Sequence, residues 1–366
     1  MIKYVYTEIL ELKMGKTKKK QIGLYVLYGA LTAFVLVLIL SFNDIGEIMS
    51  TIMGAHAGYV LLAVLSLLIY VLLYPLSLCI LTKARGCDIR FGTTYNIAMT
   101  EHFFNGITPF ATGGQPFQAY AYKKAGVRVS ESTCLLLMNF MVFMIVTNGF
   151  ALSSLFYFKR FVTDGAMAAI AVVGFTMNFS VLGVTVLLAT SSHVRKWLSA
   201  LLDFLCKFRW TAKLLAPRVE NLKEYFVNVQ EAFSALVKKK LAFVLALLTK
   251  ILSMAAYYAT TFFILRALWI DVPLEEIFFV ICGTSFAVTM VVFLPTPGSS
   301  GGIEFAFKSV FATLAAGAAA SVSYGGMLIW RLLSYYLVML VSLVFYVVLE
   351  VGFSRARRRE CEKEET

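Results

Sequence analysis

Two related polar segments interrupt apolar stretches of this chain. Thr108–Gly114 reads Thr-Pro-Phe-Ala-Thr-Gly-Gly, and Thr296–Gly302 reads Thr-Pro-Gly-Ser-Ser-Gly-Gly. Proline removes a backbone donor and glycine weakens a helix, so each segment leaves backbone polar groups that lipid cannot satisfy. Bare N–H groups at a helix start bind anions, and we therefore expect each segment to face protein, water or a polar ligand such as a phosphate.

Ionisable side chains near these segments need a partner, a cavity or a ligand if they lie at membrane depth. Glu304 and Lys308 are four residues apart and share one helix face, which is typical of an intrahelical pair. Lys250 lies near the middle of an apolar run, where a cation suits a carboxylate or a phosphate. Arg331 lies in the last run and could snorkel to the interface. The carboxylates Glu101 and Glu304 suit a cationic headgroup.

The predicted substrate-binding residues come from the two segments and from the groups beside them. They are Glu101, Asn105, Thr108, Pro109, Gly113, Gly114, Gln115, Lys250, Thr296, Pro297, Gly301, Gly302, Glu304 and Arg331. The alternative is that proline and glycine only kink two packed helices, which membrane helices tolerate. A single copy would favour that alternative, whereas two related copies at matching positions favour a ligand site.

The sequence indicates no catalytic residue, metal site or cofactor. Glu101 and His102 are adjacent and point in different directions on a helix, and the glycine pairs lack the Lys-Ser/Thr of a nucleotide loop. The six cysteines are scattered without a Cys-x-x-Cys pair, and the three histidines are far apart. Lys and Arg outnumber Asp and Glu by 33 to 21, but their position beside apolar runs favours membrane orientation over nucleic-acid binding.

The composition is that of an integral membrane protein. Hydrophobic residues make up 60% of the 366 residues, and the mean hydropathy is +0.79. Several apolar runs reach the roughly 20 residues that cross a bilayer, and the first lacks a cleavage site, so we expect it to be retained. The predicted spans are Gly23–Ser41, Ala57–Leu81, Thr133–Phe158, Ala166–Thr190, Leu241–Leu268 and Tyr324–Val351. Broken apolar regions lie near Thr93–Tyr122 and Ile277–Ser321.

The basic segments predict the orientation of these spans. By the positive-inside rule both termini and every basic connection belong on the cytoplasmic side of the cell membrane. The first broken region has basic residues on both sides, so it enters from the cytoplasm as a re-entrant hairpin or as two short crossings. The second follows the acidic loop Asp271–Glu276 and therefore enters from outside.

The predicted fold is an all-α polytopic membrane protein with six full spans and two broken or re-entrant hairpins. The order span, span, hairpin, span occurs twice in opposite orientation, which is an inverted repeat, and transporters commonly bind substrate where such repeats meet. The predicted parts are a basic cytoplasmic tail (1–21), repeat 1 (22–158, hairpin near 93–122), repeat 2 (159–351, hairpin near 277–321) and a second cytoplasmic tail (352–366). Repeat 2 is interrupted at 192–240 by apolar stripes beside basic residues, typical either of amphipathic helices on an anionic leaflet or of a connector packed on the bundle.

The two segments and their flanks resemble the signature stretches of a known family. Asn105–Gly126 and Leu294–Glu304 are similar to the membrane region of bacterial lysylphosphatidylglycerol synthase/flippase proteins, and the similarity extends over nearly the whole chain. The resemblance implies a domain that translocates aminoacylated phosphatidylglycerol. In that family a C-terminal domain transfers lysine from tRNA to the lipid; the sequence ends at Thr366, so we expect the translocating part without the aminoacyltransferase domain. Relatives associated with polyprenyl-linked sugars leave the lipid open.

We therefore expect a lipid translocase that moves a phospholipid, or another lipid-linked headgroup, between leaflets. One alternative is the membrane subunit of a phosphatidylglycerol lysyltransferase system, which confers resistance to cationic antimicrobial peptides, or of polyprenyl-linked sugar metabolism. Its partner would be a separate cytosolic aminoacyltransferase or glycosyltransferase. A second alternative is a scaffold that recruits a cytosolic protein through 192–240.

Overall fold

A computed structural model of the chain describes residues 53–162, 164–206, 219–294, 296–299, 301–314 and 320–364. These residues form α-helices, short 3-10 turns and one π-helical segment, and they contain no strand. The predicted all-α class is thereby confirmed. The predicted span Gly23–Ser41 and the basic tail before it lie outside the described residues.

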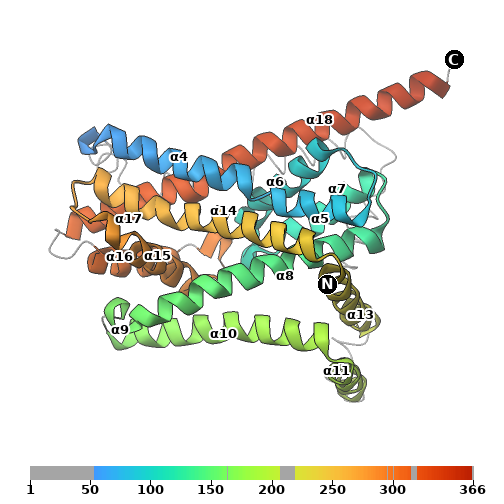
Figure 1. Cartoon of the computed structure of the whole chain (residues 1–366), viewed down its shortest axis with the longest axis horizontal. Coiled ribbons are helices and arrows are strands. Elements are labelled where there is room, and N and C mark those ends of the chain that lie inside the picture. Colours follow the sequence, from blue (N-terminus) through green and yellow to red (C-terminus); the bar gives the residue numbers. More distant parts are fainter. Residues whose placement is uncertain are drawn as a thin grey trace.

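The helices follow one another with short connections (Figure 1). Those of the first half are α4 (Ala57–Leu73), α5 (Leu76–Arg85), α6 (Phe91–Ile107), the turn η1 (Pro109–Ala111), α7 (Gly114–Lys124), α8 (Val129–Ser154), η2 (Leu155–Tyr157) and α9 (Phe158–Phe161). Those of the second half are α10 (Gly165–Thr190), α11 (Ser192–Leu205), α13 (Val219–Lys238), α14 (Lys240–Ala267), η4 (Leu274–Glu276), α15 (Ile277–Val291), η5 (Pro297–Ser299), α16 (Gly302–Leu314), α17 (Ala320–Arg331), the π-helical η6 (Leu332–Leu337) and α18 (Val338–Glu364).

Six helical stretches of the described residues are long and apolar enough to cross a membrane. They are Ala57–Arg85, Val129–Phe161, Gly165–Thr190, Lys240–Ala267, Leu274–Val291 and Gly325–Ala356. Five of them coincide with predicted spans, which confirms the membrane class. The fifth in chain order is the first arm of the second broken region, so by length and composition that arm alone could cross the bilayer.

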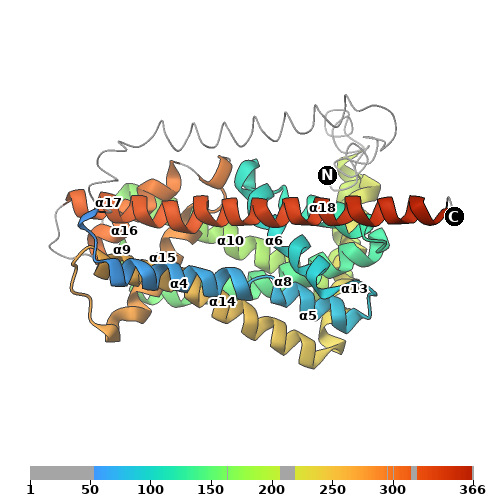
Figure 2. The same ribbon diagram turned by 90° about the horizontal axis from the view of Figure 1, so that it is seen from above.

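The first hairpin, α6–η1–α7, begins and ends at the same end of the bundle. Arg85 ends α5 just before it, and Glu131 lies in the first turn of α8 just after it. The guanidinium of Arg85 donates two hydrogen bonds, both 2.6 Å, to the carboxylate of Glu131. The second hairpin, α15–η5–α16, lies toward the opposite end (Figures 1 and 2). The broken region 93–122 therefore enters and leaves at one end of the bundle, as expected both for a re-entrant hairpin and for two short crossings.

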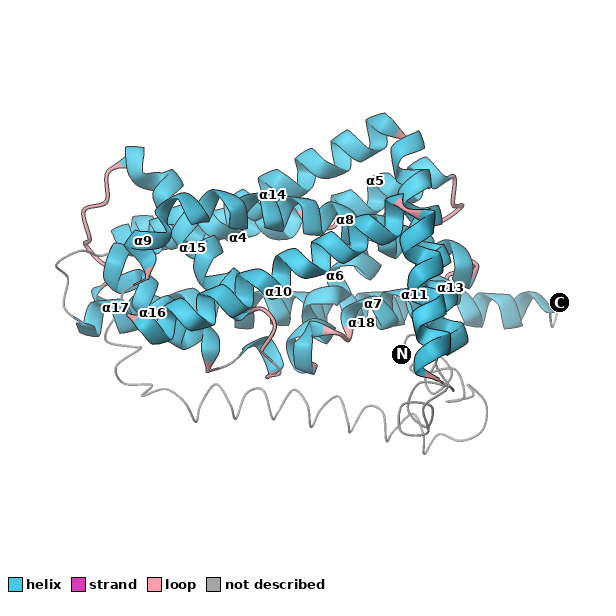
Figure 3. Ribbon diagram, turned by 90° about the horizontal axis from the view of Figure 1, so that it is seen from below, coloured by secondary structure: helices cyan, strands magenta, loops and turns pink. Residues whose placement is uncertain are grey.

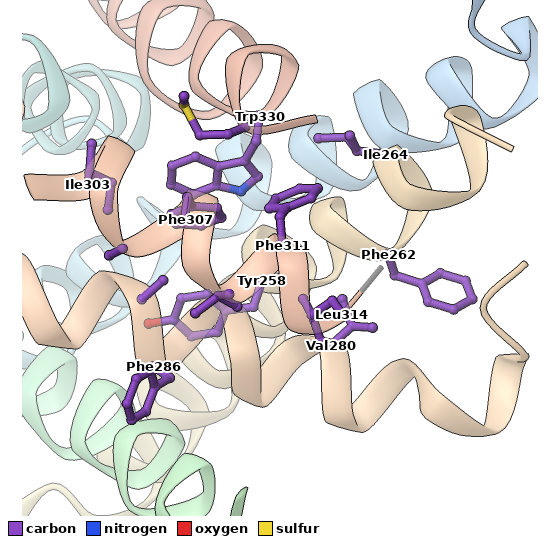
Figure 4. Close-up of a cluster of buried hydrophobic side chains, with 14 of the residues drawn as sticks. Tyr258, Phe262, Ile264, Val280, Phe286, Ile303, Phe307, Phe311, Leu314 and Trp330 are labelled. Atoms are coloured by element: carbon purple, nitrogen blue, oxygen red, sulfur yellow. The ribbon is translucent and has the colours of Figure 1, made fainter. Parts of the chain in front are cut away.

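Each hairpin is packed in its own cluster of buried apolar side chains. Figure 4 shows the cluster of the second hairpin, in which Phe307 of α16 stacks on Trp330 of α17 with 3.7 Å between ring centroids. The first hairpin buries Phe103 and Tyr122 against Leu135 of α8. Close packing of this kind holds membrane helices together, because lipid tails offer apolar surroundings as good as another helix.

The packing partners of the two halves correspond. The second helices of the halves, α4 and α14, pack on each other; α6 packs on α18 as α15 packs on α8, and the turns η1 and η5 are in contact. An inverted repeat requires such paired contacts, because a pseudo-two-fold axis exchanges the halves. The opposite orientation of the halves in a membrane stays a prediction.

The segment between the halves divides into two helices of different kind. The apolar stripe of α13 packs on α8 and α10, with Val229 and Leu236 each 1% exposed. By contrast α11 has no buried residue, and its Trp197 is 64% exposed. Both helices lie across the spans at one end of the bundle (Figure 3). The packing of α13 is that expected of a connector on the bundle, and the two interpretations of 192–240 stay predictions.

The approach of α10 to α15 depends on one glycine. A β-carbon at Gly174 would overlap the backbone of Met290, whereas one at Gly183 in the same helix would meet nothing within 4 Å. We expect Gly174→Val to cost about 1–3 kcal/mol of stability, because overpacking forces the helices apart. Thermal unfolding in detergent should show a lower midpoint for Gly174→Val and little change for the control Gly183→Val. Equal midpoints for the two variants would contradict this contact.

Candidate functional site at two helix corners

The two related segments form corners with the same backbone conformation. In the first corner Phe110 and Ala111 have φ values of 56° and 50°; at the equivalent positions of the second corner Gly298 and Ser299 have φ values of 58° and 53°. The same internal bond closes each corner, from Ala111 N to the carbonyl of Thr108 and from Ser299 N to the equivalent Thr296. Three of these four residues carry a side chain in the left-handed region, which is costly and is often found at functional sites.

Side chains at the C-terminal end of α6 hold the first corner. The hydroxyl of Thr108 donates to the carbonyl of Phe104 at 2.7 Å and accepts from the N–H of Gly113 at 2.9 Å. The amide oxygen of Asn105 accepts from the N–H of Gly114 at 2.8 Å. These two N–H groups, which we expected to be bare, are thus already bonded within the protein.

An ion pair holds the second corner. Glu304 accepts from the N–H of Gly301 at 2.6 Å and lies 3.3 Å from the guanidinium of Arg331. Arg331 also donates to the carbonyl of Gly298 at 2.9 Å. This arrangement corrects two expectations. Glu304 pairs with Arg331 and not with the exposed Lys308, and Arg331 is 5% exposed and turns inward instead of snorkelling.

Tyr335 of the π-helical segment joins the corners. Its hydroxyl donates to the carbonyl of Gly106, just before the first corner, at 2.8 Å. Its ring lies against Gly298 in the second corner, where a β-carbon would overlap it. Four residues earlier, the guanidinium of Arg331 lies 4.2 Å from the centroid of the same ring. In this conformation the corners are closed around Tyr335.

A polar centre lies behind the first corner. Lys250 of α14 is fully buried, donates to the carbonyl of Tyr74 at 3.1 Å and lies 3.4 Å from the centroid of the Tyr74 ring. Glu101 accepts from the hydroxyl of Tyr74 and from the amide of Gln118, both at 3.3 Å. His102 packs on the rings of Tyr70 and Tyr74.

The sequence matches a family described as the lysylphosphatidylglycerol synthase TM region over residues 23–342. The chain belongs to this family. The match includes both corners, Lys250 and Arg331, and it supports a lipid-related membrane function. No individual curated protein was found to be similar to the chain.

Most of the predicted site residues of this family member fall into the two groups just described. The corner group contains Asn105, Thr108, Pro109, Gly113, Gly114, Thr296, Pro297, Gly301, Gly302, Glu304 and Arg331, and the polar centre contains Glu101 and Lys250. Gln115 is half-buried, and its neighbour Gln118 is the amide that reaches Glu101. The predicted binding role of these residues stays a prediction.

Two tyrosines were missed by the sequence analysis. Tyr335 follows Arg331 by four residues and therefore shares its helix face, which is the one signal that could have indicated it. Tyr74 precedes Pro75, and a proline inside an apolar run marks freed carbonyls that buried donors can use. Tyrosine has an apolar ring and a polar hydroxyl, so sequence alone does not separate packing from bonding.

The predicted chamber between the corners is not established by these contacts. A cavity of about 330 Å³ lies elsewhere, between α10 and α13, and is lined by Val181, Leu188 and Tyr225 among others. The chamber between the corners therefore stays a prediction.

Gly298 is the position where a methyl group should be least tolerated. Its φ is 58°, and a β-carbon would overlap the Tyr335 ring, whereas one at Gly149 in α8 would meet nothing within 4 Å. We expect Gly298→Ala to displace Tyr335 and to lower the midpoint of thermal unfolding by several degrees, consistent with a cost of about 1–3 kcal/mol. Gly149→Ala is the control. A Gly298→Ala protein as stable as this control would contradict the closed corner.

Proposed function

We propose that this protein is a lipid translocase that moves a phospholipid, such as aminoacylated phosphatidylglycerol, or another lipid-linked headgroup between leaflets. The observation that carries the proposal is the meeting of two corners of matching conformation, from two hairpins at opposite ends of the bundle. Discontinuous helices that meet between repeats are where transporters of this architecture bind polar substrates. Membership in a lipid-related family supports the same conclusion.

Arg331 is the group best suited to a lipid phosphate. Its guanidinium is held in a planar fork geometry that suits phosphate as well as carboxylate. The carboxylate of Glu304, whose side chain is 33% exposed, now occupies one side of it. A phosphate that replaced Glu304 on Arg331 would also free the N–H of Gly301, so one exchange would supply both a cation and a backbone donor. Glu304 would then be available to a cationic headgroup.

Movement of Tyr335 would open the site. Its hydroxyl bond to Gly106 and its contact with Gly298 join the two hairpins, so both must break before the corners separate. Hairpins that lie toward opposite ends would then face opposite sides of the membrane. Alternating access in inverted-repeat transporters uses such relative movement of the halves.

Reconstitution tests the proposed activity. Purified protein in liposomes with fluorescent phosphatidylglycerol in one leaflet should exchange the label between leaflets without a cosubstrate, as measured by albumin back-extraction. Arg331→Met should reduce the rate at least tenfold, because the buried cation is lost, and Lys308→Met is the matched control on an exposed lysine. A new lipid product in place of exchange would support the lipid-modifying alternative. If neither exchange nor a new lipid product is observed, the translocase proposal is overturned.

Thiol labelling tests the opening of the corners. In a cysteine-free background, Thr112→Cys and Ser299→Cys should react with membrane-impermeant reagents, from opposite sides or through one cavity that alternates. Tyr335→Phe should accelerate labelling at both positions, because a bond worth about 1 kcal/mol no longer holds the corners together. Protection of both cysteines from reagents on both sides, with and without Tyr335→Phe, would argue against a water-filled site.

A further inference from the structure

One tyrosine separates a buried lysine from a half-buried carboxylate. Tyr74 lies between α4 and α5, beside Pro75. Its carbonyl and ring hold Lys250, at 3.1 Å and 3.4 Å, and its hydroxyl donates to Glu101 at 3.3 Å. Among the ion pairs of the described ranges, none joins Lys250 to Glu101 directly. Tyr74 therefore contacts the lysine with its carbonyl and ring, and the carboxylate with its hydroxyl.

The two charges differ in their access to the surroundings. Lys250 is 0% exposed, whereas Glu101 is half-buried on α6, one helical turn before Asn105 and the first corner. Water or a headgroup at the corner could therefore reach Glu101 while Lys250 stays covered. A Lys250 ammonium needs a negative partner, because an uncompensated buried cation is very costly.

The other titratable groups around Glu101 belong to three elements. Tyr70 lies in α4 and Tyr74 lies in the break between α4 and α5, and both face Glu101. His102 follows Glu101 on α6. Lys250 and Tyr257 come from α14, while α7 offers the neutral amide of Gln118. The hydroxyl of Tyr70 is 3.5 Å from both ring nitrogens of His102, and the His102 ring packs on the rings of Tyr70 and Tyr74. Glu101 is the carboxyl group of this centre.

We propose that Glu101 takes up one proton for each anionic lipid phosphate that the protein moves. The inference rests on the proposed translocase function and concerns its coupling. In the resting state the Glu101 carboxylate balances the Lys250 ammonium across Tyr74. When a phosphate monoanion enters at the first corner, it replaces Glu101 as the charge that balances Lys250. A proton from water on that side then converts the Glu101 carboxylate to a carboxylic acid.

The same exchange runs in reverse on the other side of the membrane. The phosphate leaves, the carboxylic acid returns its proton to water on that side, and the carboxylate again balances Lys250. With phosphatidylglycerol, whose phosphate is its one charge, one proton and one lipid monoanion cross together, so the cycle moves no net charge. A proton gradient therefore drives the lipid, and a membrane potential alone does not.

The test uses full-length protein in liposomes that contain fluorescent phosphatidylglycerol as the lipid monoanion. One set of liposomes carries a pH difference of one unit with the potential clamped to zero by potassium and valinomycin. A second set carries a potassium diffusion potential with equal pH. The leaflet distribution at steady state is read by albumin back-extraction, and an internal pH dye reports proton movement. A one-unit gradient should shift the leaflet ratio by up to about tenfold, because one pH unit corresponds to about 1.4 kcal/mol per proton.

Two variants separate coupling from folding. Glu101→Gln keeps the shape and the hydrogen-bonding capacity but cannot bind the proton, so the pH gradient should no longer shift the ratio and lipid movement should no longer acidify the lumen. His102→Gln tests the neighbouring titratable group and should keep the response to the gradient. The double variant Glu101→Gln with Lys250→Met removes both charges together, and it should also lack the response while avoiding an unbalanced buried cation.

The outcomes distinguish failure of the proton coupling from failure of the proposed translocase function. Lipid exchange that follows the potential and ignores the pH difference overturns the coupling and leaves the translocase intact. A persistent pH response in Glu101→Gln, or its loss in His102→Gln, overturns the assignment to Glu101. Absence of any exchange in the wild-type protein removes the proposed function itself.

Discussion

The structure depends on one constraint, which is that backbone groups freed by proline and glycine inside a bilayer must find partners within the protein. Three breaks meet this constraint with side chains. At Pro75, Tyr95 donates to the carbonyl of Val71 and Lys250 to that of Tyr74. At the first corner Thr108 and Asn105 accept from the glycine N–H groups. At the second corner Glu304 accepts from the N–H of Gly301, and Arg331 donates to the carbonyl of Gly298.

The two buried cations are built in the same way. Each donates to a carbonyl at a helix break, Lys250 to Tyr74 and Arg331 to Gly298, and each lies over a tyrosine ring. Each also has a carboxylate close by, Glu101 for the lysine and Glu304 for the arginine. The cation–π contact and the carbonyl offset part of the cost of burial without neutralising the charge. What remains is a positive site that an anionic headgroup could compete for.

The two carboxylates differ in how tightly they are committed. Glu304 contacts its cation directly, so exchange for a phosphate requires breaking an ion pair. Glu101 is separated from its cation by Tyr74, so its charge can be cancelled by a proton without moving Lys250. The direct pair of Glu304 and Arg331 suits selection of a headgroup. The separated pair of Glu101 and Lys250 suits coupling to protonation, because a proton is small enough to bind Glu101 without displacing Tyr74. In the proposed translocase the two sites would thus divide recognition and energy use between the hairpins.

The sequence by itself determined the membrane class, five of the six candidate spans of the described residues, the two broken regions and the list of ionisable groups within apolar runs, because apolar run length, basic flanks and repeated Thr-Pro-Gly-Gly patterns are local signals. Only the tertiary structure decided which groups meet. Glu304 lies 27 positions before Arg331 and Lys250 lies 176 positions after Tyr74, and no local pattern ranks such distant partners above the nearby Lys308. The closing of both corners on Tyr335 was likewise decided by packing, since a tyrosine in an apolar run has the same sequence signal whether it fills space or bonds to a freed carbonyl.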